Sequence, residues 1–235
     1  VDVAPFDNND LRMAVKLSVD REQLVKKILL DHGALGNDHP ISTANAYHNA
    51  EMAQRSYDPD KARFNLKKAG MEGVTLDLST SDAAFAGAVD AALLRNDSAA
   101  KAGLNINVVR EPKDGYWSNV WNVQSFSTSY WGGRPTQDQM YSTAYLSTAD
   151  WNDTRFLNTS FDKVLLEARA ELDQNKRKEM YRDMALMVRD TGGLILPMFN
   201  DFVDGVANNV GGWSADPNAE LMNNKAPIKC WIKDA

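Results

Sequence analysis

Residues 57–70, YDPDKARFNLKKAG, contain a complete helix with both a start signal and a stop signal. Asp58 offers a carboxylate to the unpaired amides of the first turn, and Pro59 takes the first helical position, where its missing N–H costs nothing. Gly70 is the matching stop, because glycine readily adopts the left-handed conformation that ends many helices. Between these signals the apolar positions share one face, which comprises Ala62, Leu66 and Ala69. The stretch therefore predicts a helix that lies on a core and turns its charged side chains to solvent.

The same stretch resembles the Tyr-Asp-Pro-x-x-Ala-x-x-x-Leu-x-x-Ala-Gly signature of the peptide-type, family 5, solute-binding proteins that serve bacterial ABC importers. Residues 5–25, PFDNNDLRMAVKLSVDREQLV, are similar to another segment of that family, in which a second helix follows a capped break. Further similar segments follow in the family's order, namely GNDHPI (36–41), REPKDGYWSNVW (110–121), YWGGRPTQDQM (130–140) and LPMF (196–199). The resemblance spans nearly the whole chain.

The composition is that of an ordinary globular chain with an acidic balance. Its 235 residues are 43% hydrophobic, which is enough to bury a substantial core. Asp and Glu number 32 against 26 Lys and Arg, a net charge of −6, so we expect no nucleic-acid partner and no binding to an anionic membrane. The sequence has no run of about 18 apolar residues, so we expect no direct membrane insertion. Cys230 is the single cysteine, which excludes an internal disulfide and gives no indication of compartment.

The first half of the chain alternates helical and strand patterns. Asp20 and Gln23 form a candidate capping box that opens a helix extending to Gly33. Residues 74–80 and 104–109 alternate apolar and polar side chains, as strands with one buried face do. The helical stretch between them has apolar positions at Phe85, Val89, Ala92 and Leu93. The unit therefore predicts a strand, a crossover helix and a parallel strand.

The second half predicts two more helices and two more strands. Residues 161–170 and 177–189 have helical periodicity, and residues 124–131 and 194–198 have the character of strands. In the second helix the apolar stripe is expected in the core and comprises Met180, Met184, Met187 and Val188. From about residue 205 the chain loses this periodicity and becomes rich in Asn, Gly and Pro. We therefore predict an internal boundary near Asp204.

The resemblance implies an α/β fold of the periplasmic-binding-protein type (class II, type 2), with a mixed sheet flanked by helices. Residues 1–204 would form the C-terminal α/β lobe of a two-lobe protein, and residues 205–235 would return to the first lobe. Val1 is not a methionine and no signal-like segment precedes the first helix, so we expect a C-terminal fragment. The family further implies a periplasmic or other extracytoplasmic location, a monomer, and an inner-membrane ABC permease as partner.

Residues 130–138, YWGGRPTQD, are the best candidates for a ligand site. A strand end, two glycines that let a ligand approach the backbone, and a fixed cation suit a ligand crevice, although a glycine turn with a surface arginine would look the same. With the resemblance, the candidate ligand-binding residues are Trp131, Gly132, Gly133, Arg134, Thr136, Asp138 and Trp151. Peptide-binding relatives often place an amine-binding aspartate at this turn, and the chain has Arg134 there. We therefore predict a ligand with an anionic group, the alternative being an Arg134 that faces solvent or pairs with Asp138.

The tryptophans divide by context. Trp117 and Trp121, four residues apart, are predicted to pack in the core. Trp131, beside the glycines, is predicted to line the crevice, and the position of Trp151 relative to the core stays open.

Other chemistries have weaker support. His32, His39 and His48 lie near one another in sequence, but their spacing matches no helical metal-binding pair, so we expect no metal. A glycosidase would require paired carboxylates, for which the candidates are Asp138, Asp150 and Asp153. Cys230 has no neighbouring histidine, and the sequence has no nucleotide-binding fingerprint. We expect neither catalysis nor a cofactor.

The resemblance implies capture of a peptide or peptide-like solute between two lobes, followed by delivery to the permease. Two alternatives stay open: the ligand-sensing module of a transcriptional regulator, and binding of a sugar or a nickel complex by the same fold.

Overall fold

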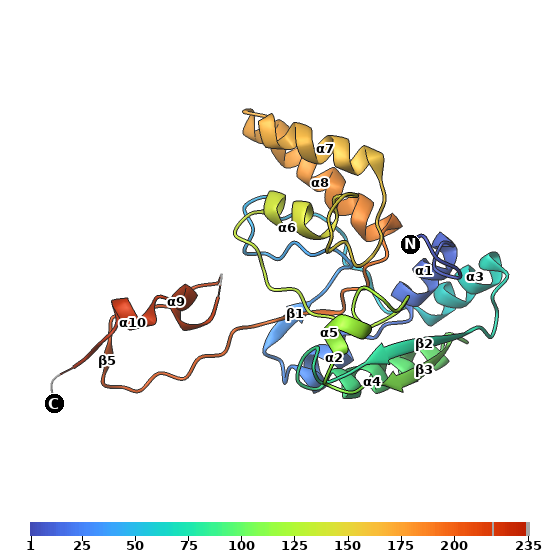
Figure 1. Cartoon of the computed structure of the whole chain (residues 1–235), viewed down its shortest axis with the longest axis horizontal. Helices are drawn as coiled ribbons and strands as arrows, with labels where there is room; N and C mark the ends of the chain where they lie inside the picture. Colours follow the sequence, from blue (N-terminus) through green and yellow to red (C-terminus); the bar gives the residue numbers. More distant parts are fainter. Residues whose placement is uncertain (218, 234–235) are drawn as a thin grey trace.

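The computed structural model describes residues 1–217 and 219–233, which form a body of helices and short strands with a projecting C-terminal segment (Figure 1). The first half of the body contains α1 (Asn9–Leu17), α2 (Arg21–Ile28), β1 (Gly33–Leu35), α3 (Pro59–Ala69), β2 (Thr75–Thr80), α4 (Ala88–Ala100), β3 (Asn105–Arg110) and α5 (Tyr116–Asn119). The second half adds α6 (Gln137–Ala144), α7 (Thr159–Ala170), α8 (Gln174–Thr191) and β4 (Met198–Asn200). The C-terminal segment contains β5 (Val210–Gly211), α9 (Glu220–Asn224), α10 (Ala226–Lys229) and β6 (Trp231–Ile232).

The helix α3 confirms the prediction from residues 57–70. The side chain of Asp58 accepts a hydrogen bond from the backbone N–H of Lys61 at 2.9 Å, and Pro59 is the first helical residue. Gly70 ends the helix with a φ of 69°, in the left-handed region. Ala62 and Leu66 are buried, so the predicted face packs inward.

A parallel strand pair with a crossover helix forms the first core, as the sequence predicts. Thr75 to Thr80 of β2 pair in register with Asn105 to Arg110 of β3, and α4 connects them. The core cluster joins this unit to α1 and α3 and comprises Leu11, Ala14, Val15, Leu66, Leu76, Leu78, Ala92, Ala99, Leu104 and Ile106. The inward face of α4 differs from the prediction, because the helix begins at Ala88, after Phe85, and leaves Leu93 49% exposed. The buried positions of α4 are instead Ala88, Ala91, Ala92, Ser98 and Ala99.

Three helices form the second core, which lies above the first in Figure 1. The cluster is rich in aromatic residues from α6, α7, α8 and the loop between α6 and α7, including Tyr141, Tyr145, Phe156, Phe161 and Tyr181. The methionine stripe of α8 is confirmed as core: Met184 is fully buried, and Met180 and Met187 pack against the cluster from partly buried positions.

Two strand predictions are wrong. Residues 124–131 form no regular strand and make one parallel bridge, Ser79 to Ser127, in which Thr128 donates to the carbonyl of Ser79 at 2.9 Å. At residues 194–198, regular structure begins only at Met198, and β4 pairs antiparallel with β1. The backbone N–H of Leu196 donates to the Asp38 carboxylate at 3.0 Å, so a side chain replaces a strand as its partner.

The helix that opens at Asp20 ends earlier than predicted. The capping bond is present, because the Asp20 side chain accepts from the N–H of Gln23 at 3.0 Å. The helix nevertheless stops at Ile28, since Leu30 and Asp31 adopt left-handed conformations with φ of 51° and 65°. This break lets β1 form before residue 36.

The strands within the described ranges form three separate two-stranded sheets, one parallel and two antiparallel, with helices packed around them. The α/β class is therefore confirmed, with a sheet that is divided into small pairs. The part of the chain that the structure describes has no helix long and apolar enough to cross a membrane.

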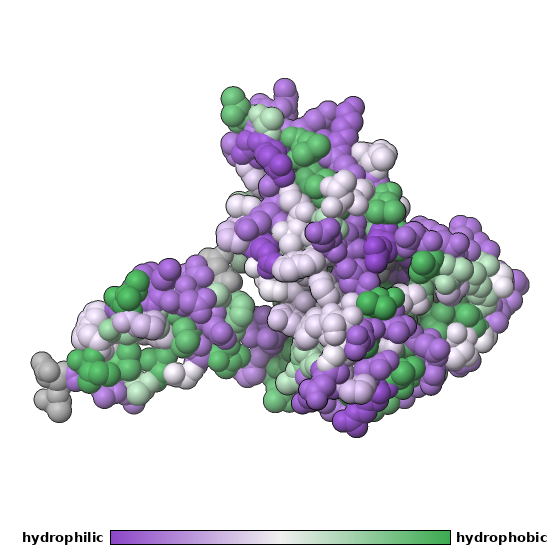
Figure 2. Space-filling model, viewed as in Figure 1, coloured by the Kyte–Doolittle hydropathy of each residue, from purple (hydrophilic) through white to green (hydrophobic). Residues whose placement is uncertain are grey.

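The C-terminal segment leaves the body after β4 and carries apolar residues on its surface (Figures 1 and 2). Its exposed apolar side chains include Leu221, Ile228, Trp231 and Ile232. The short β5 and β6 pair antiparallel with each other, and Trp231 lies against Gly211 and Gly212. The assignment of residues 205–235 to another lobe stays a prediction.

Candidate functional site

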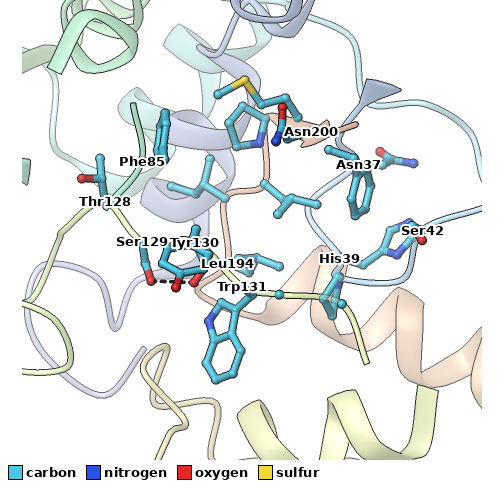
Figure 3. Close-up of a pocket in the computed structure, with 18 of the residues that line it drawn as sticks. Asn37, His39, Ser42, Phe85, Thr128, Ser129, Tyr130, Trp131, Leu194 and Asn200 are labelled. Atoms are coloured by element: carbon cyan, nitrogen blue, oxygen red, sulfur yellow. Dashed lines mark hydrogen bonds between the residues drawn. The ribbon is translucent and has the colours of Figure 1, made fainter. Parts of the chain in front are cut away.

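A cavity of about 2290 Å³ lies where segments from both cores meet, and Figure 3 shows part of its wall. The segment before β1 and the loop after it contribute His32, Asn37 and His39, and α4 contributes Ala91 and Arg95. Residues 121–135 and 193–203 complete much of the wall. The cavity is therefore built from segments far apart in sequence, which a local motif cannot define.

Trp131 lines this cavity together with Gly132, Gly133 and Arg134. Its indole N–H donates to Oδ2 of Asp153 at 3.1 Å, and the indole N–H of Trp121 donates to the same oxygen at 2.8 Å. Burial raises the pKa of the Asp153 carboxyl, and the two indole N–H groups oppose this shift. One carboxylate therefore fixes two indole rings of the cavity wall.

The indole rings continue from the cavity wall onto the surface. The ring centroids of Trp121 and Trp131 are 6.3 Å apart, and Trp151 lies 6.1 Å from Trp131 and 6.3 Å from Trp121. Trp117 extends the cluster, with its centroid 5.9 Å from that of Trp121. Trp151 is 51% exposed and lies outside the residues that line the cavity.

The predicted core packing of Trp117 and Trp121 is wrong. Trp117 is 40% exposed, and Trp121 is partly buried in the cavity wall. Their neighbours Tyr116 and Val120 take the buried positions, and the Tyr116 hydroxyl donates to the carbonyl of Thr128 at 2.7 Å. The two buried residues are four positions apart, as predicted for Trp117 and Trp121, but they are Tyr116 and Val120, one position earlier in the sequence.

Arg134 is held by its own turn. Its Nη1 donates to the carbonyl of Gly132 at 2.8 Å, and its Cζ lies 5.7 Å from the ring centroid of Trp131, within the range of a cation–π contact. The alternative that Arg134 pairs with Asp138 is wrong, because Asp138 pairs with Arg169 at 3.1 Å.

Thr136 and Asp138 have structural roles at the start of α6. Thr136 is the N-cap, and its hydroxyl accepts from the N–H of Gln139 at 3.2 Å. Asp138 lies in the first turn, where a carboxylate is favourable. Both lie outside the residues that line the cavity, and a contact of either with a ligand stays a prediction.

The three histidines all line the cavity, in different settings. Burial lowers the pKa of His39 to about 4, and His48 adds to this shift, so the ring is neutral at physiological pH. The ring centroids of His39 and His48 are 6.2 Å apart, and His48 Nδ1 lies 3.2 Å from the carbonyl oxygen of Ile41. Within the described ranges, no group of three or more His, Cys, Asp or Glu is placed to hold a metal ion.

The acidic residues proposed as a carboxylate pair have separate surroundings. Asp138 pairs with Arg169, Asp153 accepts from two indoles, and Asp150 is exposed. This arrangement gives the glycosidase interpretation no support.

Sequence reasoning missed Arg95, which lines the cavity from α4. Its guanidinium lies over the ring of Phe126, with Cζ 4.7 Å from the centroid. The sequence does contain a signal for this position. Residue 95 lies at helical spacing from the inward-facing alanines of α4, which are Ala88, Ala91, Ala92 and Ala99, so a cation there is expected on the inward face.

Comparison with known proteins identifies what the chain is similar to. Residues 1–153 match the family model described as "Bacterial extracellular solute-binding proteins, family 5 Middle". The dipeptide-binding protein of Escherichia coli K12 is 24% identical over 228 residues, which cover 91% of this chain and 41% of that protein.

Two solved structures share the fold. The periplasmic binding protein DppA of Helicobacter pylori, in complex with the peptide STSA, has a TM-score of 0.77 at 16% identity, covering 99% of this chain and 45% of its own. NikZ of Campylobacter jejuni, in complex with Ni(L-His), has a TM-score of 0.71 at 20% identity, covering 94% of this chain and 47% of its own. The chain thus spans about two fifths to one half of the length of these relatives.

Proposed function

The chain belongs to family 5 of the bacterial extracellular solute-binding proteins, and from this premise we propose that it is part of a binding protein that captures a peptide or peptide-like solute for an ABC importer. The full-length protein would act outside the cytoplasm, as a monomer, and would deliver its solute to an inner-membrane permease. Its task is binding, without a chemical step. A dipeptide-binding relative and a fold relative that holds a peptide support this choice of solute.

The cavity carries the proposal. Its volume of about 2290 Å³ exceeds the roughly 300–1,000 Å³ of ordinary small-ligand pockets, which suits an extended solute. Indole faces and backbone groups of the 129–135 segment are available along one wall, and both are groups that bind peptides well.

Capture would proceed by a population shift between open and closed arrangements of two lobes. A ligand stabilises the closed form only if it contacts both lobes, because equal affinity for the two states shifts nothing. In this proposal residues 1–204 supply one jaw, and residues 205–235 return to the other.

Arg134 is proposed to bind an anionic group of the solute at the rim of the cavity. Its guanidinium is charged at all physiological pH values and offers a planar set of donors to a carboxylate. Trp131 and Gly132 already hold the side chain in place, so part of the ordering cost is met before the ligand arrives.

The test begins with the full-length protein purified under mild conditions, followed by mass spectrometry of the solutes that it retains. Titration calorimetry then compares tripeptides, a nickel–histidine complex and simple sugars as ligands. Tight binding of peptides alone would support the proposal, and tight binding of the nickel complex or a sugar alone would overturn it. Binding only after fusion to a DNA-binding domain would favour the regulator.

The role of Arg134 has its own test. In Arg134→Gln, acidic tripeptides should lose about tenfold in affinity while neutral tripeptides are unchanged. Arg182→Gln removes a cation that pairs with Glu51 on the surface, and it should change neither set. Equal retention of both sets by Arg134→Gln would remove Arg134 from the site.

A further inference from the structure

One cation of the cavity wall, Arg95, forms no ion pair with any residue that the structure describes. Nε and Nη2 of Arg95 are buried and donate to no acceptor among the described residues, and Arg95 enters no ion pair there. Its neighbour is the ring of Phe126, which is itself packed against Phe6 at a centroid distance of 5.1 Å. Burial lowers the pKa of the guanidinium to about 10, so it is still charged at neutral pH.

A partly exposed cation with two buried, unpaired nitrogens is unusual, because removing a charge from water costs several kcal/mol unless a partner offsets the cost. Two buried arginines of this chain have partners for most of the guanidinium, although Nε of each is also unpaired within the described ranges. Arg12 donates to the carbonyls of Phe6 and Thr191 and to Asn9, and Arg21 pairs with Asp38. Among the described residues, the fold therefore supplies hydrogen-bond acceptors for Arg12 and Arg21 and none for Nε and Nη2 of Arg95.

The position of Arg95 explains where a partner can come from. Ala91 and Ala92, on the same face of α4, also line the cavity, as do Leu78 and Phe126. The named neighbours of Arg95 on this wall are thus apolar. The charge of the buried Asp38 raises the pKa of Arg95, but Asp38 forms its ion pairs with Arg21 and Arg55. A solute that enters the cavity can reach this wall and supply the missing acceptor.

We propose that Arg95 is a binding residue that takes a carboxylate of the solute, with the ring of Phe126 holding the guanidinium in place. This inference rests on the proposed solute-binding function and names a chemical class within it: a solute with a free carboxylate, such as the C-terminus of a peptide. Arg95 differs from Arg134 in that Arg134 already donates to Gly132, whereas Nε and Nη2 of Arg95 donate to no described residue.

The proposal predicts opposite effects of one substitution on stability and on binding. Arg95→Met keeps the apolar stem and removes the unpaired charge, so the unliganded full-length protein should become more stable, with a higher urea midpoint. The same substitution should weaken binding of the carboxylate ligand about tenfold to a hundredfold, the range for a charge-assisted hydrogen bond. A residue with a purely structural role would lose stability instead.

Arg12→Met is the matched control. Arg12 also lines the cavity but has three hydrogen-bond partners, so its replacement should lower the urea midpoint. The ligands are trialanine with a free carboxylate and trialanine amide, measured by titration calorimetry. Wild type should prefer the acid, and Arg95→Met should bind the acid and the amide alike.

The outcomes separate the two proposals. If wild type binds both peptides equally, or if Arg95→Met keeps the preference, the role of Arg95 is overturned while peptide capture stands. If wild type binds neither peptide, peptide capture fails, and thermal shifts with sodium acetate and inorganic phosphate decide the inference. Stabilisation of wild type by acetate that is absent in Arg95→Met supports it, and stabilisation by phosphate alone, or by neither, overturns it.

Discussion

Nη2 of Arg21 lies 2.8 Å from both carboxylate oxygens of Asp38, and their side chains are 3% and 0% exposed. Asp38 also accepts from Arg55 at 2.7 Å and from the backbone N–H of Leu196 at 3.0 Å. Arg55 in turn pairs with Asp190 near the end of α8. A single carboxylate thus joins α2, the segment before α3, the end of α8 and the 194–197 segment.

Asp38→Ala should destabilise the protein severely. Two guanidinium groups would lose a buried partner, which costs about 3–5 kcal/mol because the uncompensated charges stay out of water. Urea unfolding monitored by circular dichroism measures the change. The control is Glu51→Gln, which removes the ion pair between Glu51 and Arg182. The Glu51 side chain is 78% exposed, so the free energy of unfolding should change by less than about 1 kcal/mol. Similar midpoints for Asp38→Ala and wild type would contradict the stabilising role.

Lys16 should make stability depend on pH. The side chain is fully buried and donates to the carbonyls of Arg189 and Gly192 at 2.8 and 2.7 Å. Burial lowers its pKa to about 7 from 10.5, so between these values the unfolded chain binds a proton that the folded chain does not. The contribution of Lys16 therefore rises with pH across this window, by at most about 1.4 kcal/mol per unit, and is constant below it.

The comparison is wild type against Lys16→Met in urea at pH 6, 8 and 9.5. The free energy of unfolding of wild type, minus that of the variant, should increase from pH 6 to pH 9.5. A difference that stays level would show that the lysine titrates alike in the folded and unfolded states.

Trp131→Ala in the full-length protein should weaken solute binding about tenfold without unfolding the protein. The indole lines the cavity, lies beside the guanidinium of Arg134 and packs against the second core from a partly buried position. Trp117→Ala removes an indole of the same cluster that lies outside the cavity lining, and it should leave affinity unchanged. A folded Trp131→Ala with wild-type affinity would exclude this residue from the site.

Asp153→Asn should disturb the ring positions of Trp121 and Trp131. The carboxylate accepts from both indoles and from the backbone N–H groups of residues 153 and 154. In the Asp153→Asn variant one of the two oxygens is replaced by an NH2 group, which cannot accept a hydrogen bond, so some of these donors lose their acceptor. Near-ultraviolet circular dichroism should change, while Asp150→Asn, an exposed neighbour, should leave the spectrum as in wild type.

The Asp153 carboxyl should also make the stability of wild type depend on pH, with Asp153→Asn as the reference. Because burial raises the pKa of Asp153, the folded state takes up a proton more readily than the unfolded state as pH falls towards 3.8. The stability of wild type relative to Asp153→Asn should therefore increase from pH 7 to about pH 4.5. A decrease over this range would show that hydrogen bonds to the charged form outweigh burial.

The sequence by itself determined the elements whose signals are local. The helix at 59–69 follows from Asp58, Pro59 and Gly70, and the parallel strand unit follows from two alternating stretches around a helix. The family also follows from local strings, because residues 57–70 and 5–25 keep a recognisable order and spacing.

Only the tertiary structure decided the rest, because the deciding contacts join residues far apart in the chain. In place of the strand predicted at 194–198, the backbone N–H of Leu196 donates to the Asp38 carboxylate. In place of Trp117, Tyr116 is buried, and its hydroxyl donates to the carbonyl of Thr128. The missing partner of Arg95 is likewise a property of its surroundings, which α4, Phe126 and the cavity supply together. Local signals set where helices begin and end, whereas burial and pairing depend on which segments meet.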